Sequence, residues 1–455
     1  MSIQIRCLTV LLTLSFLTSP ARPQQRPAEL AAPQVEELTL EQAVALALQE
    51  NRQVKVAQLE LDKFSDRLAV AKTHRLPHFE FSVLAAQLIN PVEFNFKKGD
   101  LGNLTGVGPV PGADVTVKAP RRPAFFINGG AFQPLSQQYR LGLVDRKIET
   151  GREIAKEQLR GKRLEVANNV KRAYYAVLQS QSALRSVEQT LKLYRELDRV
   201  TDQFVFQQVA LKADSLEVKT RVEKIVYEAM TLRDQLEDQQ EKLNNLLGRD
   251  IRTEFHVSPV PELTSYEADL GTARELALSH RPEIIEAKLK IKATEYDRRI
   301  KKSEYIPDLS FGIRYAAVQD VKLLPQNIAQ VGFLLTWEPF DWGRKRREMA
   351  EINKTAAQSE TSLSETQNLI LIEVGDKYRK LRQTRQMLVT ARLAQETAGE
   401  NVRVLNARYA AQEALIKDVL QSQAALAEAN HQYQQALLSF WTAKADFEKA
   451  IGADR

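Results

Sequence analysis

The stretch that decides the fold runs from Lys162 to Leu247 and reads KRLEVANNVKRAYYAVLQSQSALRSVEQTLKLYRELDRVTDQFVFQQVALKADSLEVKTRVEKIVYEAMTLRDQLEDQQEKLNNLL. It contains no glycine and no proline, and it is rich in Leu, Ala, Glu, Gln, Lys and Arg, which favour the helix. From Val170 to Leu197 its apolar residues recur at alternating steps of three and four. This spacing is typical of a helix that packs against another helix.

A single helix of this length would extend for roughly 130 Å, so we expect the chain to reverse within the stretch. The apolar pattern lapses at Gln207–Ala213. Asp214 follows, with Glu217 three residues later, and this pair predicts a capping box at the start of a second helix. The stretch is therefore predicted to form a long antiparallel helical hairpin.

The surrounding sequence occurs twice. The segment LEQAVALALQENRQVKVAQLELDK from Leu40 matches LGTARELALSHRPEIIEAKLKIKA from Leu270, and Val170 corresponds to Val374. Within each copy, one continuous helix is expected before a proline, beginning in the first copy at the Thr39 cap and ending near Leu76. Each copy therefore predicts a helix, a strand, a loop, a returning strand, a long helix, a turn and a second long helix.

The N-terminus has the pattern of an exported protein. Arg6 closes a short N-terminal region, Cys7–Thr18 is apolar but too short to span a membrane, and cleavage is expected after Ala21. Cys7 is the only cysteine, so no disulfide is expected in the mature chain. The expected domains are a signal peptide (1–21), an extended leader (22–39), a first repeat (40–248, with a strand pair at 78–133 and a hairpin at 140–247), a linker (249–269) and a second repeat (270–455, with a strand pair at 308–338 and a hairpin at 344–451). A long loop is expected at 90–123.

The strand pairs alternate between apolar and polar residues, which indicates sheets with one face of each kind. Their runs approach the roughly 9–11 residues of a tilted membrane strand. Four charged residues fall on the polar face by this alternation and are candidates to face a water-filled lumen: Glu80, Asp308, Arg314 and Glu338. Two strands per copy give four per chain, too few to close a membrane barrel of about 8 strands or more. We therefore expect several chains to share one barrel.

This layout resembles the TolC-like outer-membrane efflux protein family in both halves. The resemblance depends on the paired motifs, on the junction Glu338–Gly343 (EPFDWG) and on the segment from Arg408 to Leu420. It implies a mainly α fold with a small β part: a homotrimer with a 12-stranded transmembrane β-barrel continuous with a periplasmic α-helical barrel. It also implies an outer-membrane export duct of a tripartite efflux or type I secretion system, with a periplasmic adaptor, an inner-membrane pump and outer-membrane lipid as partners.

The resemblance implies a periplasmic gate at Asp214, Tyr409 and Asp418. Departures from the family pattern are Gln421 in place of a second aspartate, Ala414 in place of an arginine, and Gln208 and Gln412 where a turn glycine is common. Each aspartate has a structural alternative, because a carboxylate followed three residues later by Glu or Gln also caps a helix. Tyr409 has one too, as a packed aromatic of the helical seam.

Other functions find little support in the sequence. The net charge of +6 is spread along the chain, so nucleic-acid binding is not indicated. The histidines are scattered, and Pro77 interrupts the helix that would align His74 with His78. No catalytic residues, cofactor or metal site are therefore expected. Two alternatives have no pore, a periplasmic adaptor and a coiled-coil scaffold.

Overall fold

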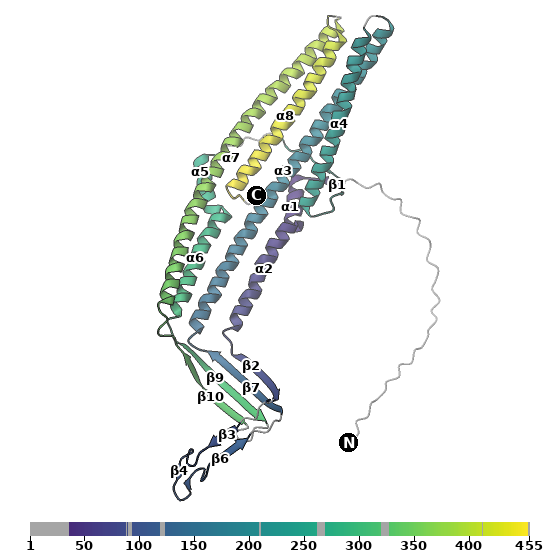
Figure 1. Ribbon diagram of the computed structural model, residues 1–455. Coiled ribbons are helices and arrows are strands. Elements are labelled where there is room, and N and C mark those ends of the chain that lie inside the picture. Colours follow the sequence, from purple (N-terminus) through teal and green to yellow (C-terminus); the bar gives the residue numbers. More distant parts are fainter. Residues whose placement is uncertain are drawn as a thin grey trace, which may run out of the picture.

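The structure is a computed structural model, and it describes residues 36–87, 89, 93–118, 123–208, 211–261, 269–319, 327–411 and 413–453. The expected signal peptide lies outside these residues. Long helices form one extended layer, and a small sheet continues from one end of it (Figure 1). No helix in the described part of the chain combines the length and the apolar character needed to cross a membrane.

The two copies have the same order of principal elements. The first consists of α1 (Leu40–Glu50), α2 (Arg52–Thr73), β2 (His78–Gln87), β7 (Pro123–Pro134), α3 (Gln138–Phe206) and α4 (Lys212–Leu247). The second consists of α5 (Leu270–His280), α6 (Pro282–Ser303), β9 (Asp308–Gln319), β10 (Asn327–Thr336), α7 (Arg344–Ala410) and α8 (Ile416–Ala450). The predicted hairpins are thus present, with turns between Phe206 and Lys212 and between Ala410 and Ile416.

The prediction of one continuous helix before each strand pair is wrong, because each copy has two helices there, α1 and α2 in the first copy and α5 and α6 in the second. Asn51 ends α1 and begins α2: its amide nitrogen donates to the Leu246 carbonyl (2.8 Å) and its side-chain oxygen accepts from Gln53 N (2.8 Å). In the second copy Arg281 takes this position and donates through Nη1 to the Ala450 carbonyl (3.2 Å). Each break therefore attaches the short helix to the last turn of its own hairpin.

The core is continuous between the repeats. Buried residues of α1, α3 and α4 form one cluster, α5, α7 and α8 form a second, and α3 packs along α8. Tyr174, 1% exposed, donates to the Ser258 carbonyl (2.7 Å) beside the parallel pair β1 (Glu36–Leu38) and β8 (Phe255–Val257). Burial raises the pKa of its hydroxyl to about 12.

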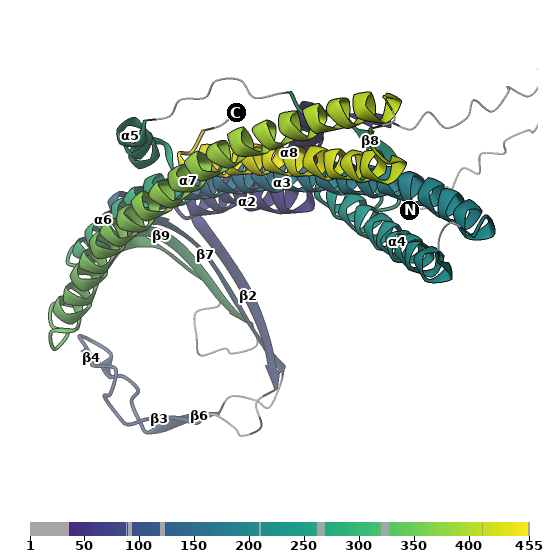
Figure 2. The ribbon, with the colours of Figure 1, turned by 90° about the horizontal axis from the view of Figure 1, so that it is seen from above.

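The four long strands form one antiparallel sheet in the order β10-β9-β7-β2, which curves away from the helices (Figure 2). The glycines in β7, a residue type that weakens a strand interior, have a packing role here. A Cβ atom at Gly130 would lie 2.7 Å from the Phe132 ring, and one at Gly312 of β9 would lie 2.6 Å from it. These two glycines therefore make room for an aromatic ring on one face of the sheet.

The loop expected at 90–123 contains short strands, which corrects that prediction. In its described part, β3 (Glu93–Phe96) pairs with β6 (Val115–Lys118), and β4 (Asn103–Leu104) pairs with β5 (Gly108–Pro109). Phe94 lies opposite Val117 and Phe96 opposite Val115, so one face of the outer pair is apolar. The glycine and proline content conceals these strands because each is only two to four residues long.

Candidate functional site

The register of the sheet divides its side chains between two faces, since directly opposed residues lie on the same side. Glu80 opposes Gly130, Gly130 opposes Arg314, and Arg314 opposes Gln330, so these residues form one row across all four strands. Asp308 lies on the same face by alternation. The opposite face carries a set of large apolar side chains, all more than half exposed: Phe79, Phe81, Val83, Ile313, Val331, Phe333 and Leu335.

Three of the four lumen candidates therefore lie on one polar face. Arg314 lies over the Phe132 ring, 5.5 Å from its centroid, and Asp308 forms an ion pair with Arg140 of α3 at 3.1 Å. Glu80 reaches over Gly130, where an added Cβ would lie 3.4 Å from its carboxylate. This face presents charges and glycines together with the exposed Leu84 and Leu334, while the other presents a mostly apolar surface.

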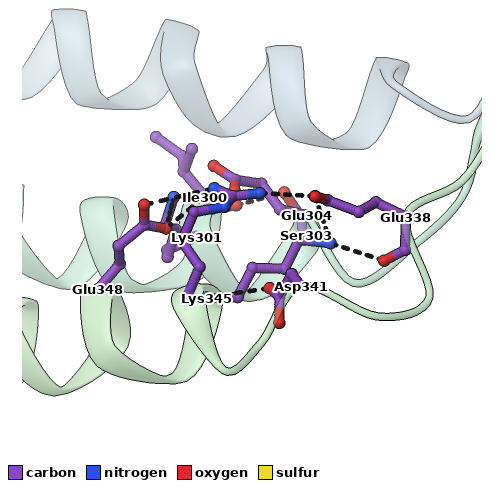
Figure 3. A network of polar contacts seen from close by, with 9 residues as sticks. Ile300, Lys301, Ser303, Glu304, Glu338, Asp341, Lys345 and Glu348 are labelled. Carbon is purple, nitrogen blue, oxygen red and sulfur yellow. Dashed lines mark hydrogen bonds and ion pairs between the residues drawn. The ribbon is translucent and has the colours of Figure 1, made fainter.

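Glu338 does not belong to that face, which corrects its assignment to a strand. β10 ends at Thr336, and Glu338 lies in the connection to α7. Its carboxylate forms ion pairs with Arg344 (2.6 Å) and Lys345 (3.6 Å). Figure 3 shows Glu338 beside Lys345. The alternation of apolar and polar residues continues beyond Thr336, where the hydrogen-bonded pairing of β10 with β9 ends. Alternation in the sequence therefore does not identify the last paired residue of a strand.

The same connection holds a polar network that sequence reasoning missed (Figure 3). Lys345, 6% exposed, donates through Nζ to the Glu338 carbonyl (3.1 Å), and its backbone nitrogen donates to Asp341 (3.0 Å). That backbone hydrogen bond is the main cause that lowers the pKa of Asp341. Lys301 of α6 pairs with Glu348 of α7 at 2.6 Å. The network joins the end of α6 to the start of α7, directly beside the sheet.

At the hairpin tips, Asp214 and Asp418 do not occupy the predicted N-cap position. Each is the third residue of its helix, and its carboxylate accepts a hydrogen bond from the N-cap backbone nitrogen, Leu211 N (3.1 Å) or Leu415 N (3.3 Å). The predicted capping boxes, with each aspartate as N-cap and Glu217 or Gln421 as its partner, are therefore wrong: each helix begins about one turn earlier, and the aspartate is the partner residue. Tyr409 lies in the last turn of α7, 45% exposed, on the same hairpin as Asp418.

The two tips differ in one contact that the sequence did not reveal. Asp202 of α3 accepts from Ser215 Oγ (2.6 Å) and from Lys219 Nζ (3.0 Å), both on α4. The Ser215 hydrogen bond is the main cause that lowers the pKa of Asp202, and Lys219 adds to it. The corresponding residues of the second copy are Asn406, Val419 and Gln423, which cannot form this charged clamp.

The tip turn also contains strained backbone. Gln208 has a φ of 62°, in the left-handed region, which is uncommon for a residue with a side chain. This is the position at which a turn glycine is common in the resembled family. The counterpart Gln412 lies outside the described residues. Across the described ranges, no three His, Cys, Asp or Glu side chains gather closely enough to hold a metal ion.

Comparison with known proteins agrees with this geometry. Residues 273–453 match the family described as Outer membrane efflux protein. The fold is similar to the Campylobacter jejuni CmeC outer membrane channel (16% identity, 91% of this chain, 85% of that chain, TM-score 0.72). It is also similar to CusC (15%, 95% and 99%, TM-score 0.72) and to the open Neisseria gonorrhoeae MtrE outer membrane channel (15%, 91% and 88%, TM-score 0.65). No curated protein sequence matches the chain significantly.

Proposed function

We infer that this chain, a member of the outer membrane efflux protein family, is the outer-membrane export duct of an efflux system. The observation that carries this inference is the open four-stranded sheet with one apolar and one charged face, attached to two long helical hairpins. An apolar face suits lipid and a charged face suits a water-filled lumen. The protein is located in the outer membrane and extends into the periplasm.

The strand directions agree with closure by several chains. Neighbours in the order β10-β9-β7-β2 are antiparallel throughout, so the two edge strands run in opposite directions. An edge β2 can therefore meet the β10 of another chain in the same antiparallel manner. Three chains with four strands each make a closed barrel of twelve strands, which leaves no backbone edge exposed to lipid.

The relatives by fold are channel proteins, and the duct is proposed to act without catalysis or a cofactor. Its partners are proposed to be a periplasmic adaptor and an inner-membrane pump, which supply the energy. A direct test is fractionation of cells expressing the protein. A duct is recovered with the outer membrane, needs detergent for extraction and runs as a heat-sensitive trimer. A monodisperse monomer in the soluble fraction would instead identify an adaptor or scaffold.

We further propose that Asp418, with Tyr409 on the same hairpin and Asp214 on the other tip, narrows the periplasmic end. The described geometry supports a double role for Asp418, because the carboxylate that caps α8 is still exposed to solvent. In a trimer, three such carboxylates around one axis attract cations and oppose one another's ionisation.

Replacement of Asp418 separates these two roles. Asp418→Asn keeps a side-chain oxygen for the Leu415 nitrogen but removes the charge, whereas Asp418→Ala removes both. We expect both variants to raise single-channel conductance and to lower cation selectivity in planar bilayers. A change in Asp418→Ala alone would assign the residue to helix capping, and unchanged conductance in both would exclude it from the gate.

A further inference from the structure

The protomer has two open edges, on opposite sides. Across the lower helical layer the order is α7, α6, α3, α2, and the sheet below repeats it as β10, β9, β7, β2 (Figure 1). Helix α6 packs between α3 and α7, whereas α2 packs against α3 on one side. A second copy that continues this order places its α2 and β2 against α7 and β10.

We call the boundary at which one copy's α2 and β2 would meet α7 and β10 a seam. An equivalent seam already exists inside the chain, where α3 and β7 of the first repeat meet α6 and β9 of the second. In the sheet, Gly130 of β7 opposes Arg314 of β9. Along the helices, Lys147 of α3 donates to Asp297 of α6 at 2.5 Å. Further along, a Cβ at Gly161 of α3 would lie 3.7 Å from Pro282 of α6.

The duplication assigns a counterpart to each residue of this internal seam. Leu270 corresponds to Leu40, so α6 residues correspond to α2 residues 230 positions earlier. Val170 corresponds to Val374, so α3 residues correspond to α7 residues 204 positions later. The resulting counterparts are Glu351 for Lys147, Arg67 for Asp297, Glu365 for Gly161 and Arg52 for Pro282.

Both pairs of counterparts carry opposite charges. Arg67 with Glu351 reverses the charges of the internal ion pair, and Arg52 with Glu365 places a new charge pair where the internal seam has Pro282 against Gly161. All four side chains are exposed in the protomer. Arg67 contacts Glu60 of its own helix at 3.5 Å, while the carboxylates of Glu351 and Glu365 have no ion-pair partner within the described ranges. Glu365 lies on an open face of α7 together with Lys354 and Gln358.

We propose that the seam between protomers is a structural copy of the seam between repeats, with Arg67 and Arg52 of one chain paired with Glu351 and Glu365 of a second copy. The proposal rests on the proposed function only in requiring that the chains assemble. It specifies how α2 of one chain is aligned along α7 of the next, because Glu351 lies opposite Arg67 and Glu365 lies opposite Arg52.

The same correspondence predicts the register of the strands across the seam. Glu80 opposes Gly130, and its counterpart Ser310 opposes Leu334, so Leu334 is the counterpart of Gly130. The counterpart of Arg314 is Leu84. Leu334 therefore lies opposite Leu84 of the second copy, which places Leu335 opposite Val83.

Charge exchange in the full-length protein tests the helical pairs. Arg67→Glu alone places two carboxylates together at each seam and should lower the temperature at which detergent-solubilised trimers dissociate by several degrees. Addition of Glu351→Arg should restore that temperature. The matched control is Arg67→Glu with Glu365→Arg, which has the same net charge but pairs positions 14 residues apart, about 21 Å along the helix. This crossed variant should remain destabilised, and equal rescue by both doubles would overturn the proposal.

Cysteine pairs test the strand register independently, because the only natural cysteine is Cys7 in the expected signal peptide. Val83→Cys with Leu335→Cys should form covalent trimers on oxidation, since opposed Cα atoms lie about 4.5–5.5 Å apart. Val83→Cys with Phe333→Cys should not, because diagonal neighbours lie about 7–8 Å apart. Trimers in which the second pair cross-links instead would refute this seam but leave the duct intact. A soluble monomer would refute both.

Discussion

Gly248→Ala is expected to destabilise the protein strongly. Gly248 ends α4 with a φ of 77°, and an added Cβ would lie 2.4 Å from the Glu50 carbonyl oxygen. The left-handed backbone alone costs an alanine about 1–2 kcal/mol. The contact with backbone adds to this cost, because neither the last turn of α1 nor the end of α4 can withdraw without breaking the Asn51 hydrogen bond to Leu246. Thermal unfolding of the purified protein measures the loss.

Two other glycines provide the matched controls. Gly142 lies within α3, and nothing lies within 4 Å of its added Cβ, so Gly142→Ala should stabilise the helix by about 1 kcal/mol. Gly452, the second-copy counterpart, has a φ of 74° and a closest contact of 3.2 Å. Gly452→Ala should therefore destabilise, but by less than Gly248→Ala. Equal stability of the Gly248 and Gly142 variants would contradict the packing described for the end of α4.

Phe333→Arg is expected to block insertion into the outer membrane. Phe333 lies on the apolar face of β10, 70% exposed, and a charged residue on the lipid face costs up to about 2–4 kcal/mol per chain, the upper values applying at the midplane. The cost occurs once in every chain of the assembly. Recovery of the protein with the outer membrane, together with the fraction that runs as a heat-sensitive trimer, measures the effect.

Neighbouring substitutions isolate the cause. Leu334 is the next residue and lies on the polar face opposite Ser310, so Leu334→Arg should insert normally and change only conduction. Phe333→Ala loses the same ring contact with Phe311 (centroids 5.5 Å apart) without adding a charge, so it should also insert. If Leu334→Arg failed to insert while Phe333→Arg inserted, the face that carries Leu334 would be the one in contact with lipid, contrary to our assignment.

Periodic features of this chain are readable from the sequence because they depend on neighbours a few residues apart. Steps of three and four specify the long helices, and alternation specifies β9 and β10. The same alternation separates Asp308 and Arg314 from the apolar face, as the register of the sheet confirms. Because the sequence is duplicated, both halves are expected to have the same order of helices and strands. This repeated order is the basis of the family resemblance.

Contacts between distant segments were decided only by the tertiary structure. The break at Asn51 depends on the Leu246 carbonyl, 195 residues away, and no periodic pattern reports such a partner. Glu338 leaves the polar face because Arg344 and Lys345 hold it beyond the last paired residue of β10. Local patterns determine which elements form, because helix and strand periodicities are short-range. Where an element ends, and what its last side chains bind, follows from packing against parts of the chain that the local sequence does not encode.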